Sequence, residues 1–439
     1  MAKARYQALK VREIAQGGDG VAELPDGRIC FVPGALPGDR VDVELTRDKK
    51  RWARARVLSI AEPSVYRVEP ECSYVSKGCG GCQFWHVSPE QELAWKAKAA
   101  FEAMQRIAGV VLPEPVLHHS PQIKGYRSRV RLHQGEDGVG LGFYSAEGKR
   151  LIKVGGGCEV AMPLVRAVAS DWQARLGALG AAEVLIETAS CDEVVITVML
   201  EREGLPGQTA LDALRRDVDA DAAVRGMRVR DAGGASVELG RVEVDAGEVL
   251  ASVPESEERT YTLDAGQFRQ SNPKVNALLV ERVAALLSEL GGRRVLELFC
   301  GAGNFSFALA RQLDALYGLE GSFETVRAAK MMAAGANLGH LGFARADLFE
   351  AKSYEAVVAA DFDTVLLDPP RDGAQEAARW LASAENPISN VVYIACDPGC
   401  MARDLGVLSE GGWRVEGLEF FDMFPRTRHI ETLAWLRRP

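Results

Sequence analysis

The chain has 439 residues, which is too long for a single hydrophobic core and predicts two or three domains. It contains 47% hydrophobic and 26% charged residues, has no apolar segment near its N-terminus, and has no uncharged apolar run approaching about eighteen residues, so we expect a globular cytoplasmic protein that is neither secreted nor inserted in a membrane. The net charge of -9 argues against a surface coated with nucleic-acid-binding residues, although it allows local basic patches.

Residues 1–62 alternate short β-rich runs with Gly and Pro turns, which predicts a small antiparallel barrel. The last strands carry a basic run around Trp52, which consists of Arg47, Lys49, Lys50, Arg51, Arg54 and Arg56. One interpretation is a solvated charged face. The other is a nucleic-acid surface, because basic and aromatic residues on a small barrel bind single strands through phosphate contacts and base stacking.

Residues 63–262 begin with a cysteine-rich loop and continue with a segment typical of a helix over 88–108, with Ser88 as its N-cap and Pro89 at its first position. This helix is also able to pack on the C-terminal part of the chain. The strand and helix patterns that follow predict a middle α+β domain.

Residues 263–439 alternate helical stretches with buried strands, which predicts a doubly wound α/β domain. Its first helix is expected to start at Asn272-Pro273 and to run to about Leu290, where Gly291-Gly292 would stop it.

The run VLELFCGAGNFSFALA has the pattern of a strand, a glycine-rich turn and a helix. Gly301 and Gly303 would let the backbone approach a ligand at the carboxyl end of the strand. Alone this signal is weak, because such turns join strands to helices in many folds.

The next strand ends in Glu320, about twenty residues further on, where a carboxylate can accept hydrogen bonds from ribose hydroxyl groups. The turn lacks the third glycine of the dinucleotide motif and follows an acidic Glu297, so S-adenosylmethionine is favoured over NAD. Asp347, after the following strand, would be placed for the adenine, although a lone Asp is more often a helix N-cap.

The fourth strand of this domain ends in VLLDPPRDG. In methyltransferases that act on amino groups, an aromatic residue follows Asp-Pro-Pro and stacks on the target base. Arg371 stands there instead, so another acceptor atom is expected.

Four segments occur in this order along the chain: LELFCGAGNF, LLDPPRDG, YIACDPGCMARD and DMFPRTRHIE. Together they resemble the RNA 5-methyluridine (uracil-5-) methyltransferase family, which uses S-adenosylmethionine. The resemblance covers nearly the whole chain and implies an OB-like TRAM barrel, a middle α+β domain with a cysteine cluster, and a C-terminal Rossmann-like class I methyltransferase domain. QFRQSN resembles the F-x-Q-x-N cofactor element of the family. The cofactor residues predicted by pattern and resemblance together are Gln270, Glu297, Phe299, Gly301, Gly303, Asn304, Glu320, Asp347 and Asp368.

The chemistry of the family requires a nucleophile and a base. Carbon 5 of uracil is too weak a nucleophile to take a methyl group directly, so a thiolate must first add to carbon 6 and turn the ring into an enolate. A base then removes the carbon 5 proton so that the thiolate can leave. The family motifs imply that these are Cys396 and Glu431. Arg371 and Arg403 are candidates to stabilise the negative charge on the thiolate or on the enolate oxygen. Alternatively, they contact phosphate groups or form structural ion pairs.

The family motif is usually Ser-Cys-Asn-Pro, whereas this chain has Ala395-Cys396-Asp397-Pro398, and the departure that matters for the chemistry is Asp397. An ionised Asp397 close to the sulfur would raise the pKa of the thiol and oppose its activation. This departure is the one feature that favours an RNA-binding protein with weakened catalysis.

Four cysteines are candidate ligands, Cys72, Cys79, Cys82 and Cys158, and they include one C-x-x-C pair. The pattern itself allows zinc, an iron-sulfur cluster or unrelated buried thiols. The resemblance implies a [4Fe-4S] cluster, because the ribosomal RNA branch of the family has three clustered cysteines and a distant fourth. The first gap here is one residue longer than usual.

We therefore predict an RNA (uracil-5-)-methyltransferase that binds RNA and acts as a monomer. A uridine of large-subunit (23S) ribosomal RNA is favoured as the target because of the cysteine cluster. The alternatives are uridine-54 of transfer RNA, a cytosine-5 RNA methyltransferase, and the RNA-binding protein with weakened catalysis.

Overall fold

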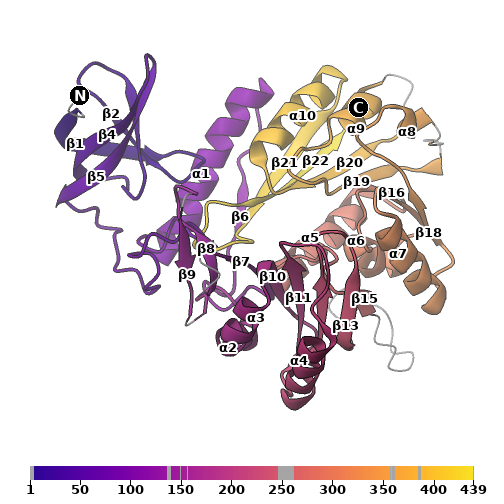
Figure 1. Ribbon diagram of the computed structural model, residues 1–439. Helices are drawn as coiled ribbons and strands as arrows, with labels where there is room; N and C mark the ends of the chain where they lie inside the picture. Colours follow the sequence, from indigo (N-terminus) through magenta and orange to yellow (C-terminus); the bar gives the residue numbers. More distant parts are fainter. Residues whose placement is uncertain are drawn as a thin grey trace.

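The structure is a computed structural model that describes residues 4–135, 140–148, 150–155, 157–245, 262–355, 357, 361–383 and 387–438. Figure 1 shows an N-terminal barrel on one side, a large α/β unit on the other, and a central α+β unit below them. Within the described ranges, no helix is both long enough and apolar enough to span a membrane.

The N-terminal unit is a closed barrel with the strand order β1-β2-β3-β5-β4. Its strands are β1 (Arg5–Ile14), β2 (Gly20–Glu23), β3 (Ile29–Val32), β4 (Arg40–Asp48) and β5 (Trp52–Glu62). The predicted barrel is confirmed, except that β3 runs parallel to β5, with Ile29 opposite Trp52. One parallel pair is unavoidable, because five strands cannot alternate in direction all the way around a closed ring.

The segment after the barrel packs with the C-terminal unit. Helix α1 (Pro89–Ala108) follows its N-cap residue Ser88, whose side chain makes no capping hydrogen bond, and it ends at Gly109 in the left-handed conformation. The buried face of α1 shares an apolar cluster with helix α10 (Pro398–Glu410). Strand β6 (Val116–His118) then forms one edge of the C-terminal sheet by pairing parallel to β21 (Arg414–Phe421).

The central unit is a seven-stranded sheet with the order β13-β12-β11-β10-β7-β8-β9. Its strands are β7 (Arg129–Gln134), β8 (Leu141–Tyr144), β9 (Leu151–Lys153), β10 (Ala181–Thr188), β11 (Val194–Leu200), β12 (Val224–Arg230) and β13 (Ser236–Gly240). Its helices are α2 (Pro163–Asp171), α3 (Gln173–Ala178) and α4 (Gln208–Ala220). A separate pair, β14 (Glu243–Asp245) and β15 (Thr262–Asp264), leads into the last unit.

The C-terminal unit is an eight-stranded sheet with the order β18-β17-β16-β19-β20-β22-β21-β6. Its remaining strands are β16 (Arg294–Leu298), β17 (Ala315–Glu320), β18 (Leu341–Arg345), β19 (Thr364–Leu367), β20 (Asn390–Ala395) and β22 (Glu431–Arg437). Its remaining helical segments are α5 (Pro273–Leu290), α6 (Asn304–Leu309), η1 (Ala310–Gln312), α7 (Phe323–Gly335), α8 (Lys352–Glu355) and α9 (Gln375–Ala382). The predicted doubly wound domain is confirmed, and α5 has the expected bounds.

Helices cover both faces of this sheet. Helices α5, α6 and α7 pack on one face through an apolar cluster that includes Val392 and Ile394 of β20. Helices α1, α9 and α10 pack on the other face through a cluster that includes Val391 and Tyr393 of the same strand. Because β17 and β19 lie on opposite sides of β16, the winding reverses there, and ligands bind at the carboxyl ends of the strands at such a reversal.

Candidate active site

The turn after β16 has a backbone that leaves room for a ligand. Phe299, Gly301 and Gly303 have φ of 62°, 54° and 95°, in the left-handed region that is costly for a residue with a Cβ atom. A Cβ at Gly303 would lie 2.4 Å from the ring of Phe307, whereas a Cβ at Gly301 would meet no described atom within 4 Å. Packing therefore requires glycine at position 303, and open space lies beside Gly301.

Glu320, the last residue of β17, lies next to this turn. Its Oε2 accepts a hydrogen bond from the backbone N–H of Gly301 (3.2 Å), and its Oε1 accepts one from the N–H of Ser322 (2.9 Å). These bonds fix the carboxylate beside the open space, where ribose hydroxyl groups could donate to it.

Asp347 and an aromatic pair extend this site toward β18. Asp347 lines a cavity of about 920 Å³, and its carboxylate accepts a hydrogen bond from the backbone N–H of Phe349 (3.1 Å). Phe349 is 52% exposed, and its ring centroid lies 5.7 Å from that of Phe299. Two aromatic rings near an acid are suited to hold a purine. The sequence reasoning missed Phe349, although an aromatic residue two positions after Asp347 was a signal.

Gln270 lies in the loop 266–271, which a buried carboxylate of the central unit holds. Glu187 accepts hydrogen bonds from the backbone N–H of Gly266 (2.6 Å) and from Nη2 of Arg269 (3.2 Å). Glu187 is fully buried, whereas Gln270 is half-buried. The position of the predicted cofactor glutamine thus depends on a residue of another unit.

Asn304, the first residue of α6, exchanges two side-chain hydrogen bonds with Asn276 of α5, at 2.9 and 3.0 Å. This amide pair joins the two helices beside the glycine turn. The structure thus shows a packing function for Asn304, and its contact with a cofactor stays a prediction.

Two acids with raised pKa values lie at the ends of β16 and β19. Burial, helped by the charge of nearby Asp368, raises the pKa of Glu297 to about 8. The hydrogen bond that its carboxylate accepts from the hydroxyl group of Ser306 acts in the opposite direction. Burial also raises the pKa of Asp368 to about 7. Both groups therefore hold protons more tightly than exposed carboxylates do.

Cys396 and Glu431 lie across from each other where β20 and β22 meet the site. Ala395, the last residue of β20, pairs with Thr432 of the antiparallel strand β22, so the next residue along β20 lies opposite Glu431. Cys396 is half-buried, and Glu431 is 2% exposed. The two residues are 35 positions apart in the sequence, and the strand register brings them together.

The titration of this pair is strongly perturbed. Burial, followed by the charge of Glu431, raises the pKa of Cys396 to about 12, while Arg371 acts in the opposite direction. Burial and Asp368 raise the pKa of Glu431 well above its usual range. Perturbed groups gathered at strand ends are typical of an active site.

Of the two arginines considered from the sequence, Arg403 has structural partners. Its Nε donates to the carboxylate of Asp404 (2.9 Å), and its Nη2 donates to the carbonyl of Asp372 (3.0 Å). Arg403 therefore holds the loop after Asp-Pro-Pro, whereas Arg371 is exposed and within electrostatic reach of the thiol.

The ring of His429, two residues before Glu431, is half-buried and packs edge-on against Phe424. Burial, followed by the charge of Arg371, lowers the pKa of His429 to about 4. The imidazole is therefore neutral near pH 7.

The four candidate ligand cysteines, Cys72, Cys79, Cys82 and Cys158, come together in the fold. Cys72, Cys82 and Cys158 share an apolar cluster with Trp85. Cys79 lies within electrostatic reach of these three. Among the residues that the structure describes, no three His, Cys, Asp or Glu side chains are close enough to hold a single metal ion.

The barrel reaches the same region through one of its loops. A Cβ at Gly18 would lie 3.4 Å from Gln83 and 3.5 Å from Arg428, which is ordinary contact distance. The barrel loop thus touches both the segment that follows Cys82 and the segment that leads into Glu431.

The sheet order, the glycine turn and the acid at the end of β17 define an α/β enzyme of the S-adenosylmethionine-dependent methyltransferase class. The family model described as tRNA (Uracil-5-)-methyltransferase matches residues 228–439, and the TRAM domain model matches residues 3–58. The 23S rRNA (uracil(1939)-C(5))-methyltransferase RlmD of Chromohalobacter salexigens is 34% identical, over 99% of this chain and 90% of that protein. The protein of the same name from Thiobacillus denitrificans is 33% identical, over 96% and 97% of the two chains. The chain therefore belongs to the RNA uracil-5-methyltransferase family.

A solved structure supports the fold of the whole chain. The tRNA (uracil-54, C5)-methyltransferase of Pyrococcus abyssi, in complex with S-adenosyl-L-homocysteine, has a TM-score of 0.70 and covers 99% of this chain and 100% of its own. The two sequences are 21% identical, so the match shows the shared fold. The protein is thus an enzyme of RNA uracil methylation with an N-terminal TRAM barrel.

Proposed function

We propose that this enzyme methylates carbon 5 of a uridine in large-subunit (23S) ribosomal RNA, with Cys396 as the nucleophile and Glu431 as the base. The observation that carries the proposal is the strand register that sets these two side chains opposite each other. A thiol and a carboxyl group at one site are what addition to carbon 6 and removal of the carbon 5 proton require.

In the first step, the sulfur of Cys396 would form a bond to carbon 6 of uracil. The thiol proton leaves, and the electron pair of the carbon 5–carbon 6 double bond moves toward the carbon 4 oxygen, so that carbon 5 becomes nucleophilic. The pKa of about 12 means that the thiol is protonated in the free enzyme near neutral pH. Activation is therefore expected to accompany RNA binding, and Arg371 is the group that favours the thiolate.

In the last step, Glu431 would take the proton from the methylated carbon 5. The electron pair of that C–H bond re-forms the ring double bond, and the bond between carbon 6 and sulfur breaks. The raised pKa of Glu431 makes it a stronger base than an exposed glutamate. Because Glu431 lies near Cys396, it can pass this proton to the sulfur, which restores the carboxylate and the thiol. The thiol proton lost in the first step is then the one proton released for each methyl group transferred.

S-adenosylmethionine supplies an electrophilic methyl group when it is bound. The open space beside Gly301 and the fixed carboxylate of Glu320 fit a ribose, and Phe299, Phe349 and Asp347 fit an adenine. Gln270, Glu297, Asn304 and Asp368 would complete this site. None of these groups needs to move a proton, so their proposed task is to bind and orient the cofactor.

We propose ribosomal RNA as the substrate class because the relatives at 32–34% identity, which match over nearly their full lengths, carry the name of a 23S rRNA methyltransferase. Membership of a uracil family also disfavours the cytosine-5 alternative. Since the described chain supplies both Cys396 and Glu431, one copy holds a complete pair, which supports a monomer. An enzyme of ribosome formation is expected in the cytoplasm.

We further propose that Cys72, Cys79, Cys82 and Cys158 hold a [4Fe-4S] cluster. Four gathered thiols are the ligand set that such a cluster needs, and each thiolate would bind a different iron, so the ligands can lie further apart than those of a single ion. The side chain of Arg127 lies beside Cys82 and Cys158, and its buried Nε makes no hydrogen bond within the described part of the chain. A buried cation requires an anion, which a thiolate-bound cluster would provide.

The experiment that tests the function is methylation of RNA by the purified enzyme, followed by mapping of 5-methyluridine. Transcripts of 23S rRNA are compared with transfer RNA, and Cys396→Ala is the control for the nucleophile. We expect one modified uridine in the ribosomal RNA and none with the variant. Methylation of transfer RNA alone, or full activity of Cys396→Ala, would contradict the proposal.

The cluster is tested by anaerobic purification. We expect a brown protein with broad visible absorption that Cys82→Ser lacks. A colourless protein with bound zinc would contradict the cluster.

A further inference from the structure

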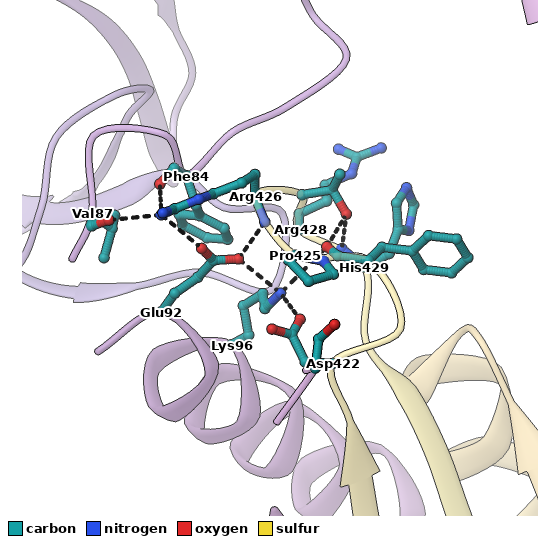
Figure 2. Close-up of polar contacts among 12 residues, drawn as sticks. Phe84, Val87, Glu92, Lys96, Asp422, Pro425, Arg426, Arg428 and His429 are labelled. Carbon is teal, nitrogen blue, oxygen red and sulfur yellow. Dashed lines mark hydrogen bonds and ion pairs between the residues drawn. The ribbon is translucent and has the colours of Figure 1, made fainter. Parts of the chain in front are cut away.

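Residues 422–430 join β21 to Glu431, and Figure 2 shows the labelled residues of this segment lying beside helix α1 and the segment 83–87. Residues 422–430 lead directly into β22, so their conformation affects the side-chain position of Glu431, the first residue of that strand. The polar groups that hold the segment come from parts of the chain more than 300 positions away.

Two cations and two carboxylates form a buried set, which we call the α1 charge set: Glu92, Lys96, Asp422 and Arg426. The ammonium group of Lys96 contacts Glu92 (3.0 Å) and Asp422 (2.5 Å), and the guanidinium group of Arg426 contacts Glu92 (3.2 Å). All four residues are at most 5% exposed. The charges balance, so the loss of one member leaves a buried charge without its partner.

The backbone of Arg426 is held as firmly as its side chain. Its φ is 69°, which is uncommon for a residue with a side chain, and its N–H donates to Glu92 (2.6 Å). Its carbonyl accepts hydrogen bonds from the N–H groups of both Gln83 and Phe84, each at 2.9 Å. Its Nη1 donates to the carbonyl of Val87 (2.9 Å). Figure 2 shows Arg426 bonded to Glu92 of α1 and to the carbonyl groups of Phe84 and Val87.

The same contacts connect the cysteine loop to the segment before Glu431. Gln83 directly follows Cys82, so its backbone bond to Arg426 joins the two loops. The hydroxyl group of Tyr126, which packs in the cysteine cluster, donates to the carbonyl of Pro425 (2.8 Å). Residues 422–430 are therefore hydrogen-bonded both to the residue that follows Cys82 and to Tyr126 of the cysteine cluster.

We propose that Arg426 is a positioning residue for Glu431. By joining α1 to the segment 83–87, it holds residues 422–430 in the conformation that presents Glu431 to carbon 5 of the target uracil. This inference rests on the proposed role of Glu431 as the base. No described contact joins Arg426 to Cys396 or to Glu431, so Arg426 acts through the segment and not on the reacting atoms.

Two variants of the full-length enzyme test the proposal. Arg426→Gly adopts φ of 69° without strain, so the backbone bonds can persist while every side-chain contact is lost. Arg426→Lys keeps the positive charge, but its ammonium group cannot reproduce the planar guanidinium that donates to both Glu92 and the carbonyl of Val87. Melting temperatures show whether each variant is folded.

We expect kcat to fall about 100-fold in Arg426→Gly, because small displacements of a catalytic group cost that much. The KM for RNA should fall together with kcat, so that kcat/KM is nearly unchanged, because the slowed step comes after covalent addition. Addition of the thiolate and methyl transfer do not need Glu431, so a covalent protein–RNA species should persist on a denaturing gel. Arg426→Lys should show the same species at a smaller loss of rate.

Two further variants separate the possible outcomes. Arg225→Gln removes an arginine whose side chain is 8% exposed and pairs with Glu193 and Asp245 in the central unit, and it should lower the melting temperature without any covalent species. Glu431→Gln should accumulate the species, and its absence there would contradict the proposed base. If the species forms with Glu431→Gln but not with either Arg426 variant, or if it forms equally with Arg225→Gln, the positioning role is wrong. Unfolding of both Arg426 variants would also overturn it.

Discussion

The carboxylate of Asp397 accepts a hydrogen bond from the backbone N–H of Cys400 at 3.0 Å. It accepts a second one from the N–H of Gly399 (2.9 Å), so Asp397 is the N-cap of helix α10 and faces the positive end of the helix dipole. Asp397 does raise the pKa of Cys396, as the sequence predicts, but burial, Glu431 and Asp368 contribute more. The departure from the family motif is thus accommodated by capping.

The first prediction concerns this cap. Asp397→Asn should keep the melting temperature, because Asn and Asp cap helices about equally well. It should also lower the pKa of the Cys396 thiol, because a negative charge near the sulfur is removed. The rate of alkylation of Cys396 as a function of pH, followed by mass spectrometry of the RNA-free protein, measures this pKa.

Glu431→Gln is the reference for that measurement. Its effect on the thiol pKa should exceed that of Asp397→Asn, because Glu431 is the stronger neighbour. A larger shift with Asp397→Asn, or no shift with either variant, would contradict this account of the thiol.

The second prediction concerns the pH dependence of stability. The pKa of Glu297 is about 8 in the folded protein, above the value of about 4.3 for an unfolded chain. Between these values the unfolded chain releases this proton while the folded protein keeps it. The stabilising contribution is therefore complete below about pH 4 and is lost as the pH rises to about 8. Glu297→Gln has no proton to release in this range, so its stability should fall less between these pH values.

The measurement is the melting temperature of the cofactor-free protein between about pH 5 and pH 8. We expect a smaller fall for Glu297→Gln, because a neutral amide can still accept the hydrogen bond from Ser306. Glu13→Gln, on an exposed part of the barrel, should leave the slope unchanged. The same slope in wild type and Glu297→Gln would show that the carboxyl is not protonated in the fold.

The sequence predicts the elements of the fold better than their contacts. The glycine turn and Glu320 belong to one βαβ pattern, so their proximity follows from local rules. By contrast, β6 has only three residues and no alternation, and its place at the sheet edge depends on packing of the C-terminal unit. The contact between Glu92 and Arg426 spans 334 positions, and no local pattern indicates it.

The candidate site divides in the same way. The family motifs indicate Cys396 and Glu431, yet only the register of β20 with β22 shows that the two lie opposite each other. Buried charges such as Glu187 and Lys96 look like ordinary surface residues in the sequence. Their partners lie in other units, so their significance is visible only in the folded chain.

The third prediction concerns the loop that carries Gln270. Glu187→Gln should weaken the hydrogen bonds to Gly266 and Arg269, because a neutral amide replaces a charged acceptor. A bond to a charged group contributes enough that affinity for S-adenosyl-L-homocysteine should fall about tenfold. Titration calorimetry measures this affinity, and RNA binding should be unchanged. Arg225→Gln, in the same unit, is the matched control, and an equal loss of cofactor affinity there would point to general destabilisation.

The fourth prediction concerns the basic run of the barrel, which separates into paired and free charges. Arg54 pairs with Asp19, and Arg56 pairs with Glu44. The exposed side chains without an ion pair in the described part of the chain are those of Arg47, Lys49, Lys50 and Arg51. If these free cations contact phosphates, each one releases counterions from the RNA when it binds.

Lys50→Ala and Arg51→Ala should therefore weaken RNA binding for all sequences and reduce the slope of log K against log salt by about 1 each. Arg56→Ala should change the slope less, because Glu44 already balances its charge. Fluorescence anisotropy at several salt concentrations measures these slopes. Unchanged slopes in Lys50→Ala and Arg51→Ala would mean that the run is a solvated face of the barrel, and that RNA is held elsewhere.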